Sequence, residues 1–364
     1  MGVLIDGNIK VTVWGESHGP AIGGVIEGFP AGVEYDEEFV ASEMARRAPS
    51  NSSYSTKRKE PDKVIVLSGI TNGMTSGSPI AFMIENKNAH SDDYHNIAMA
   101  PRPSHADYTA NIRFNGYNDA RGGGHFSGRL TAPMVFAGAL SKLFLRNYNV
   151  KIGVHMLHIA NIVDDSFINY REDDVLVELS GNIPTIKRDI KDDIMSVIDG
   201  VARDGDSIGA IIECGVYNVE AGIGGYMIEG VEPRLSSAIF NIPAVKGINF
   251  GGGEDYALGK GSEKNDEFAI ENGDIITTSN NNGGILGGIT TGMPIVFNVV
   301  VKPTPSIYKE QNSVDFATAE ATKLRIEGRH DPCVAVRAMP VIESVTAVVM
   351  ADMYMEAYGY NGTK

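Results

Sequence analysis

Cysteine is scarce in this sequence, and long apolar runs are missing. Its 364 residues include only Cys214 and Cys333, each far from other soft metal ligands. A disulfide framework or a zinc site is therefore not expected, and we predict no metal. No segment reaches the roughly 18 consecutive apolar residues of a membrane span, and the first ten residues lack the apolar centre of a signal peptide. We expect a cytoplasmic protein without a membrane segment.

Positive charge is also in short supply. The chain has 31 Lys and Arg residues against 46 Asp and Glu residues, a formal net charge of -15 at pH 7. Nucleic acids and anionic membranes need a basic face, so we expect neither as a partner. A small anion can still bind if the cations gather in one cleft, where the local field outweighs the net charge.

One stretch, residues 101–129, gathers cations in this way. It holds the glycine run at 122–124 and six arginine and histidine side chains: Arg102, His105, Arg113, Arg121, His125 and Arg129. Glycine lets backbone N–H groups approach a ligand closely, and guanidinium groups bind phosphate or carboxylate oxygens two at a time. The apolar run at 130–145 predicts a buried helix directly after this loop. The pattern indicates an anion-binding loop that leads into the core.

Periodicity and turn residues predict the main elements elsewhere. Asp36 is placed to cap a helix that ends near Arg47, and a short helix is expected after Pro233. Alternating apolar residues predict strands at 9–14, 64–67 and 80–84, and apolar runs predict helices at 186–202 and 341–358.

Several of these segments occur twice in the same order. GESHG at 15–19 resembles GDSIG at 205–209, residues 73–87 resemble 288–302, and Arg102-Pro103-Ser104-His105 resembles Lys302-Pro303-Thr304-Pro305. We predict one α/β (α+β) domain over residues 1–364, with an internal duplication of about 9–150 and 200–355 and two halves related by a pseudo-two-fold axis. Residues 88–101 would be an insertion, as a lid or surface loop.

The repeats differ at two histidines, which makes these residues candidates for function. His18 is matched by Ile208, and His105 is matched by Pro305. Histidine exchanges protons near neutrality, and Asp331, before Pro332, could act as a base or orient one. Together with the arginines they predict an enzyme that acts on a small phosphorylated acid. The residues alone leave elimination, isomerisation and hydrolysis open.

Five motifs in the chain resemble those of chorismate synthases: GESHG at 15–19, RPSHADY at 102–108, RGGG at 121–124, KPTPS at 302–306 and GRHDPC at 328–333. The resemblance extends from about residue 7 to about residue 355. It implies a carbon-oxygen lyase that removes phosphate from 5-enolpyruvylshikimate 3-phosphate by anti-1,4-elimination and forms chorismate, the last step of the shikimate pathway. It also implies reduced FMN, an external flavin reductant, and a homotetramer of β-α-β sandwich subunits.

The resemblance assigns roles to individual residues. His18 would keep the flavin or the substrate correctly protonated, His105 would protonate or hydrogen-bond the departing phosphate or the flavin, and Asp331 would assist proton removal. The residues implied around the substrate are Ser17, Arg47, Arg58, Arg102, Arg129 and Arg329. Those implied around FMN are His125, Phe126, Ser127, Pro243, Ala244, Gly287, Lys302, Pro303, Thr304, Pro305, Ser306 and Arg329.

The chain departs from the commoner family pattern at a few positions. It reads His125-Phe126-Ser127-Gly128-Arg129 where the family more often has Arg-Ser-Ser-Ala-Arg, and Ala48 and Ser53 stand at positions that are usually basic. We therefore predict no intrinsic NADPH-dependent flavin reductase, and NADP binding stays open.

Two other functions compete with the elimination. A phosphomonoesterase could use His330 or His18 as a phosphoryl acceptor. A non-catalytic module could bind an anion or a flavin without turnover.

Overall fold

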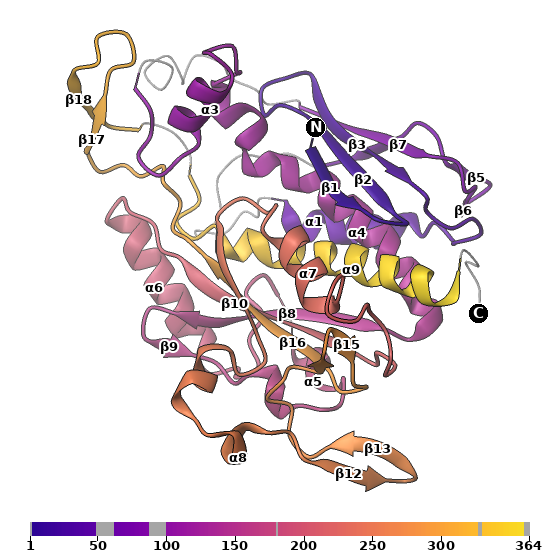
Figure 1. The fold of residues 1–364 in the computed structure, drawn as a ribbon. Helices are drawn as coiled ribbons and strands as arrows, with labels where there is room; N and C mark the ends of the chain where they lie inside the picture. Colours follow the sequence, from indigo (N-terminus) through magenta and orange to yellow (C-terminus); the bar gives the residue numbers. More distant parts are fainter. Residues whose placement is uncertain (1, 49–61, 87–99, 180, 327–329, 360–364) are drawn as a thin grey trace.

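The fold is a sandwich of two antiparallel sheets around a layer of helices (Figure 1). The computed structural model describes residues 2–48, 62–86, 100–179, 181–326 and 330–359. Each sheet has five strands, and the helices α4 and α9 lie between the sheets. The predicted fold class, a β-α-β sandwich of the α+β type, is confirmed.

The first sheet comes from the N-terminal part of the chain. Alternate side chains of its strands point into the core, as Ile80, Phe82 and Ile84 do. The strands, in their order across the sheet, are β1 (Gly2–Asp6), β2 (Lys10–Gly15), β3 (Ala21–Glu27), β7 (Ile80–Glu85) and β4 (Val64–Val66).

The second sheet is buried on both faces. Cys214 of its central strand faces the helix layer, where its Sγ lies 3.7 Å from Thr346 Oγ1, while the neighbouring Glu213 is fully buried on the other face. The strands, in their order across the sheet, are β11 (Val245–Phe250), β16 (Ile295–Val301), β10 (Ala210–Tyr217), β8 (Lys151–Ile159) and β9 (Ile162–Val163).

The helix layer contains α1 (Glu37–Arg47), α4 (Thr131–Leu145), α7 (Val231–Ile239) and α9 (Ala335–Tyr358). Asp36 caps α1 as predicted, because its carboxylate accepts a 2.9 Å hydrogen bond from Phe39 N. Nearly every residue of α4 and the first five turns of α9 are buried, since these two helices touch each other and both sheets. By length and composition α9 could span a membrane, but its apolar window is entirely buried inside the fold.

Smaller elements surround this sandwich, and two hairpins, β12–β13 and β17–β18, extend from it (Figure 1). The helical segments are α3 (Asp107–Arg113), η2 (Arg121–Phe126), η3 (Gly128–Leu130), η4 (Arg146–Tyr148), η5 (Phe167–Asn169), α5 (Val175–Glu178), α6 (Lys191–Arg203), η6 (Gly253–Leu258) and α8 (Gly261–Lys264). The two-stranded hairpins are β5 (Ile70–Thr71) with β6 (Met74–Thr75), β12 (Phe268–Glu271) with β13 (Asp274–Thr277), β14 (Ile285–Leu286) with β15 (Ile289–Thr290), and β17 (Gln311–Val314) with β18 (Ala321–Leu324).

The predicted elements are present, with three shifted helix starts, one of which is the helix expected after Pro233, since it begins at Val231. The helix expected at 186–202 begins at Lys191, because the backbone N–H groups of Ile186 and Lys187 donate to the Asp164 carboxylate instead. The helix expected at 341–358 begins earlier, at Ala335, and contains Pro340.

The two sheets share one strand order, which supports our proposal of an internal duplication. The series β2-β3-β7-β4 in the first sheet corresponds to β8-β10-β16-β11 in the second. The small hairpins β5–β6 and β14–β15 precede β7 and β16, and the core helices α4 and α9 follow them. The counterpart of β2 is β8, so we place the start of the second half near residue 151 rather than near 200.

Helices α4 and α9 are in close contact at Gly138. A Cβ atom there would lie 2.2 Å from Ser344 Cβ and 2.6 Å from Ser344 O. Because a part of this contact is backbone, it cannot be relieved by turning a side chain. The two helices can pack at this distance only if residue 138 has no side chain.

We therefore expect Gly138→Ala to destabilise the protein by about 1–3 kcal/mol, as overpacking does in a dense core. Gly200→Ala in α6 is the matched control, because nothing lies within 4 Å of a Cβ there. It should stabilise the protein by about 0.5–1 kcal/mol through helix propensity. Urea unfolding measures both, and equal effects would show that the helix contact is not tight.

A buried cluster joins β8 to β10. His155 Nδ1 lies 2.9 Å from Asp164 Oδ2, and His155 Nε2 lies 2.9 Å from Glu213 Oε2. Since carboxylates accept hydrogen bonds, both ring nitrogens must donate, which requires an imidazolium. Burial opposes this charge, but the two carboxylates outweigh it and raise the pKa of His155.

His155 should make the stability depend on pH. Because its folded pKa is raised, its contribution is fully present below the unfolded pKa of about 6.5 and is lost as the pH rises through the folded value. The free energy of unfolding, measured from pH 6 to 9, should fall for the wild type relative to His155→Gln, which does not titrate. A constant difference between the two proteins would contradict the buried imidazolium.

Candidate active site

A cavity of about 780 Å³ lies where the two core helices begin. Arg129 and Thr131 line it at the start of α4, and Val334 and Arg337 line it at the start of α9. Strands β1 and β2, the loop before α3, the glycine-rich loop and the segments 240–246 and 302–306 complete the wall. Both halves of the chain therefore contribute to one site.

The cavity is strongly cationic, although the whole chain is acidic. Among the described residues that line it, Asp331 is the single carboxylate. The cationic lining residues are Arg47, Arg102, Arg129, Lys246, Lys302 and Arg337. Such an excess of one sign in a partly enclosed space concentrates anions there. Of the arginines in the predicted stretch 101–129, Arg102 and Arg129 line the cavity, whereas Arg113 and Arg121 are not among the lining residues.

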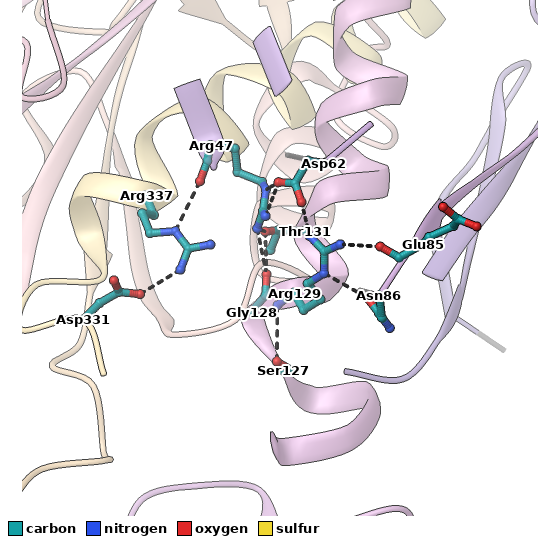
Figure 2. A network of polar contacts seen from close by, with 10 residues as sticks. All are labelled: Arg47, Asp62, Glu85, Asn86, Ser127, Gly128, Arg129, Thr131, Asp331 and Arg337. Carbon is teal, nitrogen blue, oxygen red and sulfur yellow. Dashed lines mark hydrogen bonds and ion pairs between the residues drawn. The ribbon is translucent and has the colours of Figure 1, made fainter. Parts of the chain in front are cut away.

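Asp62 joins two of these arginines within the wall (Figure 2). Arg47 and Asp62 are 1% and 2% exposed. Arg47 Nε donates to Asp62 Oδ2 at 3.1 Å, and Arg129 Nη1 donates to the other carboxylate oxygen. Arg47 also donates to Thr131 Oγ1 at 3.3 Å, and Arg129 Nε donates to Asn86 Oδ1 at 3.1 Å. One buried carboxylate thus fixes two guanidinium groups.

The pKa of Arg47 shows that positive charge is crowded here. Burial lowers it to about 10, and Arg337 and Arg129 add to the effect while Asp62 opposes it. Burial also disfavours the Asp62 carboxylate, but Arg47 and Arg129 more than offset this and hold the pKa of Asp62 below its usual value. An anion bound in the cavity would relieve the repulsion among the arginines.

A second group centres on Asp107 in the first turn of α3. Arg102 binds its carboxylate in a fork, with Nε to Oδ2 and Nη2 to Oδ1 both at 2.7 Å. His105 Nδ1 lies 2.6 Å from Asp107 Oδ1. Burial opposes the charge on Asp107, yet Arg102 and His105 hold the pKa of this carboxyl well below its usual range. Asp107 is therefore an acceptor at neutral pH.

This acceptor determines the tautomer of His105. Because Asp107 can only accept, the proton on the His105 ring stands on Nδ1, and the 3.0 Å approach of Arg102 Nη2 to Nδ1 is not a second hydrogen bond. Nε2 is left on the opposite edge of the ring, next to Gly123, where a Cβ atom would lie 3.3 Å away. An aspartate that orients a histidine in this way is the arrangement that acid/base catalysis uses.

The glycine run at 122–124 lies between the two predicted histidines. All three residues have positive φ, at 58°, 87° and 54°. A Cβ at Gly122 would lie 2.2 Å from His18 Cε1 and 3.0 Å from Ser17 Oγ. His18 is buried beneath this run and does not line the cavity itself, whereas Ser17 does. The glycines are needed for backbone shape and for close approach, as the sequence predicts.

Asp331 and His330 lie on the α9 side. Arg337 Nη1 donates to Asp331 Oδ2 at 2.8 Å. Burial, with Arg102 nearby, lowers the pKa of His330 to about 4 despite the opposing effect of Asp331. His330 is therefore neutral at pH 7. Its buried Nε2 has no hydrogen-bond partner in the described part of the chain.

The segments around Ala244 and Lys302 form the opposite wall. Lys302 N donates to Ala244 O at 2.9 Å, which joins them, and Lys302 Nζ donates to Ser104 O in the first half. Ser306 Oγ accepts a 3.2 Å hydrogen bond from Arg102 Nη1. Ala244 has a φ of 73°, a strained conformation for alanine that is often found at functional sites.

The structure brings most of the predicted site residues together. The predicted residues that line the cavity are Ser17, Arg47, Arg102, His105, His125, Phe126, Ser127, Arg129, Pro243, Ala244, Lys302, Thr304, Pro305, Ser306 and Asp331.

Besides the buried His18, four predicted residues are not placed at the wall. Gly287, in the turn between β14 and β15, accepts a hydrogen bond from Met227 N and is not among the lining residues. Pro303 packs against Gly209 instead. Arg58 and Arg329 lie outside the described residues, as do residues 88–99 of the predicted insertion.

The structure places four further residues at the site that were not predicted as site residues: Asp62, Asp107, Lys246 and Arg337. Asp107 belongs to the RPSHADY motif, so its position beside Arg102 and His105 was a usable signal. The others have no local signal, because their partners are brought together only by the fold.

The fold and the cavity define an enzyme that acts on a small anionic substrate. Comparison with known proteins identifies its family. The sequence model of the chorismate synthase family matches residues 9–355. The chain therefore belongs to the chorismate synthase family, whose members are carbon-oxygen lyases.

Individual relatives agree with this assignment. Chorismate synthase of Thermococcus gammatolerans is 41% identical over 354 residues, covering 97% of this chain and 98% of the relative. That of Pyrococcus abyssi is 44% identical over 344 residues, covering 94% and 95%. A crystal structure of chorismate synthase superposes with a TM-score of 0.75 at 29% identity, covering 96% of this chain and 93% of that chain. The phosphomonoesterase alternative finds no support.

We expect Gly122→Ala to disturb the site, because the new methyl group would overlap His18 and the backbone would keep a positive φ. The free energy of unfolding should fall by roughly 1–3 kcal/mol. Gly128→Ala is the matched control for stability, since nothing lies within 4 Å of a Cβ there. Thermal unfolding compares the two variants, and equal midpoints would contradict the tight contact at Gly122.

Proposed function

We propose that this chain converts 5-enolpyruvylshikimate 3-phosphate to chorismate by anti-1,4-elimination of phosphate, the last step of the shikimate pathway. The observation that carries the proposal is the cationic cavity in an acidic chain. The substrate has two carboxylates and one phosphate, so it suits a wall in which arginines outnumber carboxylates. Membership of the chorismate synthase family supports the same reaction.

Arginines bind and orient the substrate in this proposal. Arg47 and Arg129, held by Asp62, present their guanidinium groups from one wall, and Arg102, held by Asp107, presents its group from another. Because both carboxylates are ion-paired in advance, the arginines lose little freedom when an anion binds. Ser17, with a buried Oγ that lacks a hydrogen-bond partner among the described residues, is a further donor.

Proton transfer falls to the histidines and Asp331. His105 carries its fixed proton on Nδ1, so Nε2 must take up a second proton before it can pass that proton to the departing phosphate or to the flavin. Asp331 takes the ring proton as the C–H bond breaks. His18, buried below Gly122, keeps the flavin or the substrate correctly protonated from beneath the glycine run.

The cavity also fits a flavin nucleotide. Its wall combines apolar side chains, such as Val13 and Phe126, with Lys302 and with the buried Thr304 Oγ1, which has no hydrogen-bond partner within the described ranges. We propose that reduced FMN is held by residues 125–127, by Pro243 and Ala244, and by residues 302–306. When bound, reduced flavin supplies an electron-rich ring that can stabilise cationic or radical character as phosphate leaves.

His125 takes a place that is more often arginine in the family. Its Nδ1 donates to Gly15 O at 2.9 Å, which leaves Nε2 as the nitrogen that could face a ligand. We propose a homotetramer in the cytoplasm, supplied with reduced flavin by an external reductant. Because Ala48 stands at a position that is usually basic, we propose that the chain has no intrinsic NADPH-dependent flavin reductase activity.

An anaerobic assay tests the proposal. The protein is mixed with 5-enolpyruvylshikimate 3-phosphate, with and without reduced FMN, and phosphate release and chorismate absorbance are followed together. Equal release of both products, only with reduced flavin, is expected. Phosphate alone would indicate a hydrolase, and neither product would indicate a binding module.

His105→Ala should lose turnover by about 10²–10⁴-fold, the usual contribution of a positioned acid or base. Its thermal midpoint should stay close to that of the wild type. His158→Ala is the matched control. This histidine of β8 donates a hydrogen bond from Nε2 to Ala160 O and does not line the cavity. If His105→Ala kept its activity within a few-fold, the role given to this residue would be wrong.

A further inference from the structure

We infer that Arg337 is a positioning residue for Asp331, the residue that accepts the ring proton. The inference rests on the proposed function and extends it to a residue that the sequence motifs do not mark. Arg337 lies in the first turn of α9 and lines the cavity. Figure 2 shows it between Arg47 and Asp331, in contact with both.

Two hydrogen bonds fix the guanidinium group. Nε donates to the carbonyl oxygen of Arg47 at 3.2 Å, and Nη1 donates to Asp331 Oδ2 at 2.8 Å. Because the guanidinium plane is rigid, the first bond sets the direction of the second. The C-terminal end of α1 thereby sets the orientation of the Asp331 carboxylate, which stands in the loop before α9.

Asp331 needs such a partner. Pro332 restricts its backbone to an extended conformation but does not determine the rotamer of the Asp331 side chain. The carboxylate is also the single acidic group among the described lining residues, so several cations could attract it to other positions. Contact with Arg337 leaves Asp331 Oδ2 bound and selects one side-chain orientation.

The position of Arg337 costs electrostatic energy, because its charge repels that of Arg47. Its charge lies close enough to Arg47 to lower the pKa of that buried guanidinium. An uncharged residue of similar shape could reach the Arg47 carbonyl without this repulsion. The feature that only a cation supplies is the charge-assisted bond to Asp331.

Arg337 takes no part in the bonds that form and break during the elimination. The ring C–H bond breaks and its proton passes to Asp331, the electron pair of that bond forms a new C=C bond, the existing ring C=C bond shifts by one position, and the C–O bond breaks as phosphate leaves with its electron pair. Arg337 exchanges no proton. It keeps one carboxylate oxygen engaged, so that the proton is received by a carboxylate in a fixed place.

A double-mutant cycle tests the inference, with Arg337→Gln, Asp331→Asn and the double variant in the anaerobic chorismate assay. Arg337→Gln should lower kcat by roughly 10²-fold, the scale of a misplaced catalytic group. Adding Asp331→Asn to it should then cost far less than Asp331→Asn alone, because the two residues act as a unit. Substrate affinity, measured by calorimetry without flavin, should change much less than kcat.

Arg337→Lys provides a second readout. Lysine keeps a positive charge near Asp331 but lacks the planar fork that binds Arg47 O at the same time. Partial recovery of kcat relative to Arg337→Gln is expected. The matched control is Arg234→Gln, an equally buried arginine of α7 that pairs with Asp352 and Glu356 of α9 outside the cavity; its kcat should match the wild type.

Three results would overturn the inference. Additive effects in the cycle would show that Arg337 acts independently of Asp331. A loss of substrate affinity equal to the loss in kcat would make Arg337 a substrate-binding residue. An equal loss of kcat in Arg234→Gln would show a general effect of loosening α9. In each case the wild type still forms chorismate, whereas an inactive wild type would overturn the proposed function as well.

Discussion

The contact between α4 and α9 is the constraint on which the rest of the structure depends. Because Gly138 has no side chain, the two helices approach closely enough to fill the space between the sheets. Each helix belongs to a different half of the chain, and both begin at the cavity. The same packing that forms the core therefore brings Arg129 and Asp331 from distant parts of the sequence into one site.

The charge of this site follows from that arrangement. Arg47, Arg129 and Arg337 gather at the junction of α1, α4 and α9, and Asp62 and Asp331 are the carboxylates that pair with them within the described ranges. Such crowding costs stability in the absence of a ligand. A small molecule with several negative charges would reduce the repulsion among these arginines when it binds, and this reduction would contribute to its binding energy.

Much of the fold could be predicted from the sequence because its signals are local. The Asp36 cap, the apolar run that forms α4 and the glycines at 122–124 each require a particular backbone conformation or burial pattern. The repeated motifs led to the proposal of an internal duplication, which the shared strand order of the two sheets supports. The start of the helix predicted at 186 was wrong because a distant carboxylate, Asp164, takes the backbone N–H groups.

The rest of the site could not be predicted because its contacts are long-range. Asp62 carries no motif, yet it neutralises Arg47 and Arg129 from opposite sides. Arg337 lies outside the helix predicted at 341–358, and no motif marks it, so its contact with Arg47 O appears only in the fold. Family resemblance assigned Gly287 to a cofactor, but in this chain it lies in a turn away from the cavity wall.

A crystal structure with 5-enolpyruvylshikimate 3-phosphate and FMN tests the central claim most directly. The account predicts that the substrate lies where α4 and α9 begin, with its anionic groups about 2.7–2.9 Å from guanidinium nitrogens of Arg47, Arg102 or Arg129. The ring carbon that loses a proton should face Asp331. Substrate bound elsewhere, with these arginines still paired only to Asp62 and Asp107, would contradict the account.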